Sequence, residues 1–419
     1  MENTVEAIAT NNLLIIFSAI VITGIILGKV SEKLKLPDVI LYLIAGIIIG
    51  PAVLNWISVD AFPIENNLIL TFGSAFILYE GGREVNLKVL NKVKISVGLL
   101  ATLGVVLSTV IVGFAVNQIL GLPIMTSLLL GAIIASTDPA ALIPVFKQVS
   151  IKEKIKQTVV SESAFNDAVG AIIVSTLLAI VTSGQFSASE SIMELIIAVV
   201  VGVGVGLAVG YVFSLLISDK KWGIFHSYAP IISVLKVALA YELATMLHGS
   251  GYMAVFIVGL IAGNKKLFGL WVPEEDFHQE HNFREIIASL CRMAIFVVLG
   301  THVDLQALSQ YWLPSLMVVL ILMFVARPLV VLVCTGFDVK AKWKFKEKAF
   351  MMWVRETGVI PAALSGIVVS MKVPGYEIIS SVVFMTILVT LVVQASTTKL
   401  VAKKLDVLEE ENEIERKVA

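Results

Sequence analysis

The chain has 419 residues, of which 58% are hydrophobic and only 15% are charged. A soluble protein of this length could not bury so much apolar surface, so the composition indicates a protein that crosses a lipid bilayer many times. The formal net charge of -1 gives no basic surface for nucleic acid, and the two cysteines, Cys291 and Cys334, lack the spacing of a disulfide framework or a zinc site.

The first apolar stretch lies between residues 12 and 30. Glutamates precede it, and lysines at positions 29, 33 and 35 close it. A signal peptide has the reverse order, with its basic residues first, so this stretch is expected to remain as a membrane helix with its N-terminus outside.

Apolar stretches that are long enough to cross a bilayer recur along the whole chain. Thirteen are expected, at residues 12–30, 38–54, 66–82, 95–118, 123–146, 156–182, 190–217, 228–247, 250–264, 283–300, 313–335, 348–370 and 377–400. Lysine and arginine are concentrated in the connections that follow the odd-numbered stretches, whereas the other connections contain only Lys372. Because basic residues mark cytoplasmic loops, this alternation predicts a multi-pass cell-membrane protein with its C-terminus in the cytoplasm.

An acidic residue ends the third stretch, where Glu80 precedes Gly81 and Gly82. Charged groups at membrane depth are costly and usually functional, so Glu80 either faces an ion path or lies among the inner headgroups. The residues alone favour neither position.

The fifth stretch contains the sequence Ser136-Thr137-Asp138-Pro139. Pro139 lacks a backbone donor and disfavours helix at Asp138, so the helix is expected to break in mid-membrane. A break frees backbone carbonyls and amides, which are tolerated at that depth only where they line a cavity or meet another polar element.

The twelfth stretch has a matching interruption, which runs from Glu356 through Gly358 to Pro361. Either interruption alone would be an ordinary proline kink. Two of them at equivalent places in the two halves of the chain indicate a transport site near the midplane of the membrane.

The sixth stretch opens with two acids, Glu162 and Asp167, before an uncharged run that continues to residue 180. On a helix, residues four apart share a face, so Ser163 lies with Asp167 and offers a hydroxyl and a carboxylate to a small cation. Glu162 lies with Asn166 on the neighbouring face and needs a basic partner. The alternative is a helix end among the headgroups with two solvated acids.

Asp138 and Asp167 come from adjacent stretches and are expected to meet at the break. Together with Thr137, Ser163, freed carbonyls and water they offer only oxygen ligands, which suit a hard cation. No larger carboxylate cluster is visible, so a single Na⁺ or Li⁺ fits better than a divalent metal. Two close carboxylates also raise each other's affinity for protons, so the site is expected to take either a proton or a cation.

Two arginines lie within the apolar stretches near these positions. Arg327, in the eleventh stretch, faces hydrocarbon unless it is paired, and Glu162 is its natural partner. Arg355 lies beside the second break, where it either offsets the dipoles of free carbonyls or is neutralised by Glu356.

Three short segments recur in the same order along the chain. They pair residues 46–50 with 259–263, 82–90 with 300–308, and 139–142 with 361–364, at offsets of between 213 and 222 residues. Each pair is separated by seven stretches, an odd number, so its two copies enter the membrane from opposite sides. This predicts an inverted-topology repeat, which is an architecture of secondary transporters, with the seventh stretch as the link.

With these residues identified, almost the whole chain resembles sodium/proton antiporters of the NhaP type, within monovalent cation:proton antiporter family 1. The resemblance is carried by Thr137-Asp138-Pro139, Glu162-Ser163, Asn166-Asp167, Glu80-Gly81-Gly82 and Ala326-Arg327-Pro328. It implies an all-α NhaA-like fold of thirteen transmembrane helices, with inverted repeats and two interrupted helices that cross. It further implies a dimerisation domain (residues 1–94 and, after the linking stretch, the rest of 183–300), a core transport domain (95–182 and 301–402) and a short cytoplasmic tail (403–419).

The resemblance also implies which residues hold the ion. Asp167 would be the shared ligand of cation and proton, aided by Thr137, Asp138 and Ser163, with Glu80 reached through water.

Other residues would organise this site. The resemblance implies that Asn166 steadies the crossing of the interrupted helices, where Pro139 and Gly358 lie, and that the Glu162–Arg327 pair is structural. An Asn-Asp pair, in place of two aspartates, goes in this family with electroneutral exchange of one cation for one proton.

One departure from the family pattern occurs at the second break. Many relatives have Gly-Leu-Arg-Gly where this chain continues from Arg355 to Glu356 and Thr357. The added acid bears on the usual role of that arginine and on the ion preference.

The sequence therefore predicts a homodimeric antiporter that exchanges Na⁺ or Li⁺ for H⁺ by alternating access and serves pH homeostasis. It is not expected to be an enzyme or to need a cofactor. A K⁺/H⁺ antiporter of the same fold and a gated cation channel are the alternatives. An intramembrane aspartyl protease would need Gly-x-Gly-Asp, whereas Asp138 follows Ser136 and Thr137.

Overall fold

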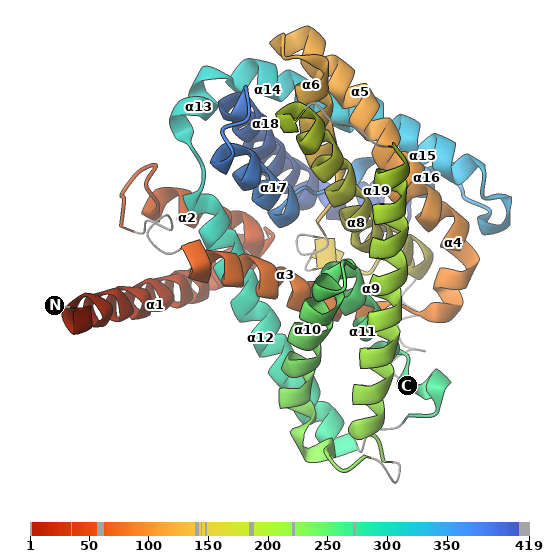
Figure 1. The fold of residues 1–419 in the computed structure, drawn as a ribbon. Coiled ribbons are helices and arrows are strands. Elements are labelled where there is room, and N and C mark those ends of the chain that lie inside the picture. Colours follow the sequence, from red (N-terminus) through yellow and green to blue (C-terminus); the bar gives the residue numbers. More distant parts are fainter. Residues whose placement is uncertain are drawn as a thin grey trace.

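A computed structural model describes residues 2–34, 36–56, 63–138, 142–143, 145–146, 149–183, 188–219, 223–270 and 274–409 (Figure 1). Its α-helices are α1 (Glu2–Leu34), α2 (Asp38–Ile49), α3 (Pro63–Glu84), α4 (Leu87–Ala101), α5 (Leu103–Leu120), α6 (Ile124–Ala135), α8 (Glu153–Ser183), α9 (Ala188–Leu216), α10 (Ala229–Met246), α11 (Gly251–Gly263), α12 (Glu274–Thr301), α13 (Leu305–Gln310), α14 (Trp312–Ile321), α15 (Arg327–Gly336), α16 (Phe345–Trp353), α17 (Val359–Ser370), α18 (Tyr376–Val389) and α19 (Ser396–Leu405). Within these described ranges no strand is present beyond one isolated bridge, so the prediction of an all-α protein is confirmed.

Seven helical segments in the described part of the chain are long and apolar enough to cross a membrane, judged by length and composition. They lie at Leu13–Leu34, Leu87–Leu120, Glu153–Thr182, Ile192–Leu216, His226–Met246, Trp312–Gly336 and Tyr376–Leu405. The apolar helices α2, α6, α11 and α17 are shorter. Each of these four lies inside a stretch that the sequence assigned to the bilayer.

The fourth stretch begins earlier than expected. Helix α4 starts at Leu87, well before residue 95, because the Asn86 side chain accepts a hydrogen bond from the Lys88 amide and caps the helix. Its first turns carry exposed lysines on one face, while Val93 and Val97 are buried on the other. A count of apolar residues therefore missed the first turns of α4, which are amphipathic.

The first expected interruption lies after α6, which ends at Ala135. Ser136 is extended, with φ -71° and ψ 148°, and Thr137 and Asp138 are not helical. Pro139, to which the sequence assigned the break, lies outside the described residues.

The second interruption separates α16 from α17. Val354 to Gly358 form no helix, and α17 begins at Val359, so Pro361 lies in its first turn, where a missing backbone donor costs no hydrogen bond. The two breaks meet, because the Asp138 amide donates to the Glu356 carbonyl oxygen at 3.0 Å.

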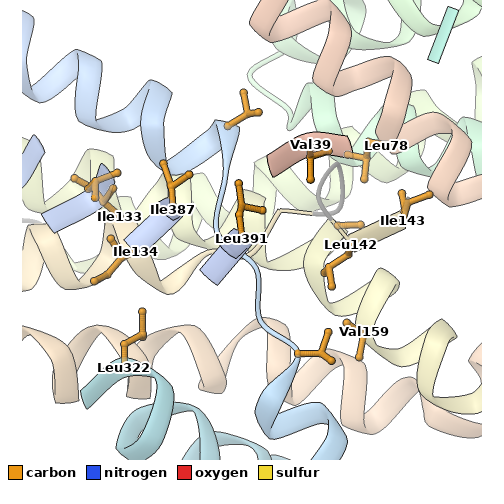
Figure 2. Packing of buried hydrophobic residues seen from close by; sticks show 14 of the residues in the cluster. Val39, Leu78, Ile133, Ile134, Leu142, Ile143, Val159, Leu322, Ile387 and Leu391 are labelled. Carbon is orange, nitrogen blue, oxygen red and sulfur yellow. The ribbon is translucent and has the colours of Figure 1, made fainter. Parts of the chain in front are cut away.

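Hydrophobic packing surrounds this meeting point on both sides. Figure 2 shows Ile133 and Ile134 of α6 near Ile387, Leu391 and Leu322, and it shows Leu142 and Ile143 near Val39, Leu78 and Val159. All ten side chains belong to one buried cluster, so the segments before and after the first break are packed into the same core.

Two π-helical turns lie beside the interruptions, at Leu322–Ala326 and Thr390–Ala395. The second supplies Thr390, whose hydroxyl accepts a hydrogen bond from the Thr357 amide at 3.1 Å, and Gln394, whose amide donates to the Trp353 carbonyl at 2.6 Å. The wider turn thus presents side chains to backbone groups that the second break leaves without helical partners.

The end of the described chain pairs with the segment before α8. Ile151 and Leu408 form the isolated antiparallel bridge, and the Glu409 amide donates to the Ser150 carbonyl at 2.9 Å. Lys152 adds a hydrogen bond from its Nζ to the Asp406 carbonyl at 2.8 Å. These contacts attach the tail to the base of the helix that carries Glu162 and Asp167.

Two glycine pairs bring helices into close contact at equivalent positions of the predicted repeat. Gly46 of α2 packs on Gly300 of α12, and Gly82 of α3 packs on Gly259 of α11. The predicted repeat matches Gly46 with Gly259 and Gly82 with Gly300, so the two crossings lie at positions that this repeat makes equivalent. A Cβ at Gly259 would lie 2.2 Å from the Tyr79 carbonyl oxygen, which is part of a backbone and cannot move aside.

We therefore expect Gly259→Ala to destabilise the protein by about 1–3 kcal/mol, because it forces the α3–α11 crossing apart. The matched control is Gly204→Ala in α9, where an added Cβ meets no atom within 4 Å. Thermal unfolding of both purified variants in detergent checks this. Equal unfolding midpoints for the two variants would show that the close crossing is not required.

Candidate ion-binding site

Helix α8 passes beside the first break and carries four of the polar residues that the sequence singled out. Glu162, Ser163, Asn166 and Asp167 are all buried, with at most 2% of each residue exposed. Because these residues recur at helical spacing, one turn of α8 presents them together to the extended segment after α6.

Asp167 is held by only one of its two carboxylate oxygens. The Ser136 hydroxyl donates to Oδ1, whereas the buried Oδ2 has no hydrogen-bond partner. An unsatisfied buried carboxylate oxygen is costly, and a cation or a proton at this oxygen would remove the cost. Ser136 was not among the residues that the sequence singled out.

Asn166 connects α8 to the break. Its side-chain amide donates to Thr137 Oγ1 at 2.8 Å. Thr137 Oγ1 donates in turn to Ser163 Oγ at 3.0 Å, and the Ser163 hydroxyl donates to the Thr137 carbonyl at 2.9 Å. The extended backbone is therefore fixed to α8 by side chains one turn apart.

Asp138 binds the backbone at the second break. Its Oδ2 accepts a hydrogen bond from the Val359 amide at 2.7 Å, at the N-terminus of α17, where amide groups lack helical partners. Gly358 is required for this approach, because a Cβ there would lie 2.0 Å from Asp138 Oδ2. Asp138 is also within electrostatic range of Asp167, so both carboxylates belong to one polar centre.

Glu162 and Arg327 form the ion pair that the sequence predicted. Arg327 Nη1 and Nη2 donate to the two carboxylate oxygens of Glu162, the latter at 3.0 Å. Arg327 Nε also donates to the Met351 carbonyl at 3.0 Å, at the end of α16. Both side chains are 3% exposed, so this bidentate pair joins α8, α15 and α16 within the protein interior.

Arg355 lies at the C-terminal end of α6. Its Nη2 donates to the carbonyls of Ile134 and Ala135, at 2.6 and 2.7 Å, so the guanidinium faces the negative end of the helix dipole. Both carboxylate oxygens of the fully buried Glu356 lack a hydrogen-bond partner. Of the two sequence alternatives for Arg355, this geometry matches the contact with helix carbonyls.

These features can be compared with known proteins. The family model for the transmembrane part of sodium/hydrogen exchangers matches residues 16–404. The chain belongs to the sodium/hydrogen exchanger family.

Curated relatives within this exchanger family are similar along nearly the whole chain. Na(+)/H(+) antiporter 1 of Methanocaldococcus jannaschii is 33% identical over 410 residues, which cover 92% of this chain and 93% of the relative. The K(+)/H(+) antiporter NhaP of Alkalimonas amylolytica is 28% identical over 96% of this chain and 68% of its own. A solved structure of the sodium proton antiporter from M. jannaschii at pH 8 matches with a TM-score of 0.77 and 31% identity, covering 94% of this chain and 99% of that one.

Glu80 is not bonded to the Asp167 centre in this conformation of the exchanger. It is 6% exposed, and its Oε1 accepts a hydrogen bond from Arg284 Nη1 of α12 at 2.5 Å. Glu80 is therefore buried and paired, and its place on the ion path stays a prediction.

Two other charged residues, Arg292 and Lys236, also find partners that the sequence did not reveal. Arg292 pairs with Asp38 at 3.1 Å. Lys236 is fully buried, with its Nζ 4.9 Å from the centre of the Tyr79 ring and 3.9 Å from Glu280. These partners are far away in the chain, so spacing along a helix contains no signal for them.

Removing the charge of Glu162 should destabilise the exchanger strongly. In Glu162→Gln, the Arg327 guanidinium stays buried without its counter-charge, and we expect a loss of about 3–5 kcal/mol. The control is Lys29→Gln, which breaks the exposed Lys29–Glu32 pair and should cost less than about 1 kcal/mol.

Thermal unfolding in detergent measures both losses, and the charge-free double variant Glu162→Met with Arg327→Met should recover part of the first. If Glu162→Gln unfolds at the temperature of the parent chain, the pair has no structural role.

Proposed function

We propose that this chain is a secondary active transporter that exchanges Na⁺ or Li⁺ for H⁺, with Asp167 occupied by the cation and the proton in turn. The observation that supports this most directly is the buried Asp167 Oδ2, which has no hydrogen-bond partner beside a break rich in oxygen atoms. A single oxygen of this kind accepts either a proton or a metal ion but not both.

The ligand set proposed for the cation consists of Asp167, Asp138, Thr137 and Ser163, with Ser136 as an addition from its contact to Asp167. All five are at most 3% exposed and present oxygen atoms, which suit a hard monovalent cation. The transported ion is the substrate, and the proposal includes no resident cofactor and no catalytic residue.

Exchange is proposed to be electroneutral. One carboxylate that releases one proton and binds one monovalent cation exchanges like charges. Ser136 supports Asp167 in either state, because a hydroxyl can donate to a carboxylate and also accept from a carboxylic acid. A bare carboxylate would face a steep cost inside the membrane, so the protein should move only when Asp167 is neutralised.

The architecture proposed for this exchange has thirteen crossings in an NhaA-like arrangement, with the N-terminus outside and the C-terminus in the cytoplasm. Residues 95–182 and 301–402 would form the moving core, and residues 1–94 and 183–300 the dimerisation domain of a homodimer. The equivalent glycine crossings and the two interruptions support the inverted repeat. Helix α1 extends away from the other helices (Figure 1), with only 11% of its apolar window buried, which suits a surface covered by lipid and a second copy.

A K⁺/H⁺ antiporter of the same design is the second candidate. The specific observation in its favour is the similarity to a protein named as a K(+)/H(+) antiporter. The hydroxyl and carboxylate oxygens at the break are ligands that potassium also accepts. A gated cation channel is less compatible with the proposal, because a channel would not couple cation flow to a pH gradient.

Reconstitution into proteoliposomes that contain a pH-sensitive dye tests these candidates. We expect external Na⁺ or Li⁺ to drive proton efflux, with a rate unchanged when valinomycin and K⁺ gradients set a membrane potential in separate experiments. Asp167→Asn should reduce the flux to that of protein-free liposomes, because it removes the carboxylate proposed to exchange its proton. The exposed Glu377→Gln is the control and should transport normally.

Each outcome distinguishes one candidate. A response to K⁺ that exceeds the response to Na⁺ would favour the second candidate, and current without proton coupling would favour a channel. Na⁺-driven proton flux that survives in Asp167→Asn would overturn the assignment of the site.

A further inference from the structure

A second polar centre lies at the end of the helices that the basic loops place in the cytoplasm. Glu280 of α12 lies in the middle of this centre, is fully buried and contacts four basic side chains. They are Arg83 at 3.1 Å, Lys265 at 3.2 Å, Arg284 at 3.7 Å and Lys236 at 3.9 Å.

This centre has more basic than acidic groups. Glu80 is the second carboxylate of this centre and is bonded to Arg284. Two carboxylates therefore face four basic groups. None of the six side chains is more than 9% exposed. Buried charges need counter-charges, and two acids do not balance four bases. The site thus has an excess of positive charge in its interior.

The ionisation of two groups reflects the same imbalance. Burial would raise the pKa of Glu280, yet Arg83, Lys236, Lys265 and Arg284 hold it well below its usual range. Burial, together with Arg83 and Lys236, lowers the pKa of Lys265 to about 8 despite the favourable Glu280 charge. Glu280 is therefore ionised near neutral pH, and its charge does not fully compensate Lys265.

A cavity of about 1090 Å³ opens beside this centre. Arg83, Lys265 and Arg284 line it, together with the exposed Lys88 and Lys266. Of the acidic lining residues, Glu80 is bonded to Arg284 and Glu84 pairs with Lys156 at 2.6 Å, while Asp219 and Glu285 also face the cavity. The basic lining residues come from α3, the start of α4, the turn after α11 and α12, and they outnumber the four acidic ones by one.

One hydrogen-bond donor of a residue that lines the cavity has no acceptor. Arg284 is 3% exposed, and its Nε–H has no hydrogen-bond partner, since the nearest oxygen of Glu280 is 3.7 Å away. A buried guanidinium with a free N–H, in a cavity that Lys265 also lines, is suited to an anionic oxygen, because a hydrogen bond between charged groups is strong.

We propose that this cavity binds a phosphate-bearing anion, either the headgroup of an anionic phospholipid or a soluble phosphate compound. The anion would contact Arg284, Lys265 and Arg83 inside the cavity, and Lys88 and Lys266 would attract it at the entrance. This proposal does not rest on the proposed exchange activity, because it concerns binding at a different group of residues.

Binding to the purified full-length chain tests the proposal. Inorganic phosphate is titrated by calorimetry onto delipidated protein in detergent. In parallel, native mass spectrometry compares retention of dioleoyl phosphatidylglycerol with that of dioleoyl phosphatidylcholine. Saturable phosphate binding identifies the soluble source, and selective retention of phosphatidylglycerol identifies the lipid source.

Two sets of variants locate the site. Lys265→Gln, and separately the exposed pair Lys88→Gln with Lys266→Gln, should weaken anion binding at least about tenfold, since each removes charge that faces the ligand. The control pair is Lys340→Gln with Lys399→Gln, which removes two exposed lysines from another part of the chain and should leave binding unchanged. The exposed pair keeps the test valid if Lys265→Gln does not fold.

No selective binding of either probe by the parent chain would overturn the proposal. So would binding that the control pair weakens as much as the cavity pair does, because that result indicates a general attraction to positive charge.

Discussion

A helix that breaks inside a membrane leaves backbone donors and acceptors without partners, and in this exchanger the two broken helices satisfy each other. The Asp138 amide bonds to the Glu356 carbonyl, and the Asp138 carboxylate accepts from the first amide of α17. Arg355 binds the last carbonyls of α6. The crossing uses these groups internally, whereas Asp167 keeps one buried carboxylate oxygen without a hydrogen-bond partner, and we propose that the ion binds there.

The crossing is stable only while the helices around it keep their positions. The Glu162–Arg327 pair fixes α8 against α15 and α16, and the Asn166 side chain fixes α8 against the first break. Elsewhere, the glycine pairs at α2–α12 and α3–α11 set the helix spacing through backbone contact. The polar pairs around the site need specific geometry, whereas the glycine pairs need only the absence of a side chain.

The sequence predicted the parts of this arrangement that follow from local chemistry. The breaks are visible because helix-breaking residues stand in apolar stretches, and Glu162 with Arg327 is visible because two buried charges of opposite sign need each other. Ser136 was missed because its role depends on how Asp167 faces the extended segment. The Glu80–Arg284 pair was missed because the two residues are about 200 positions apart, and nothing local connects Arg284 of α12 to α3.

The pairing of the chain's end with the segment before α8 has a practical consequence. Residues 406–409 are tied by backbone hydrogen bonds and Lys152 to the base of the helix that carries Asp167. A fluorophore or spin label placed just after Leu408 is therefore attached to α8, whereas one on the exposed residues His226–Tyr228, just before α10, lies in the part proposed as the dimerisation domain. In the alternating access proposed above, the distance between two such labels would report how far the helix that carries Asp167 moves in each cycle.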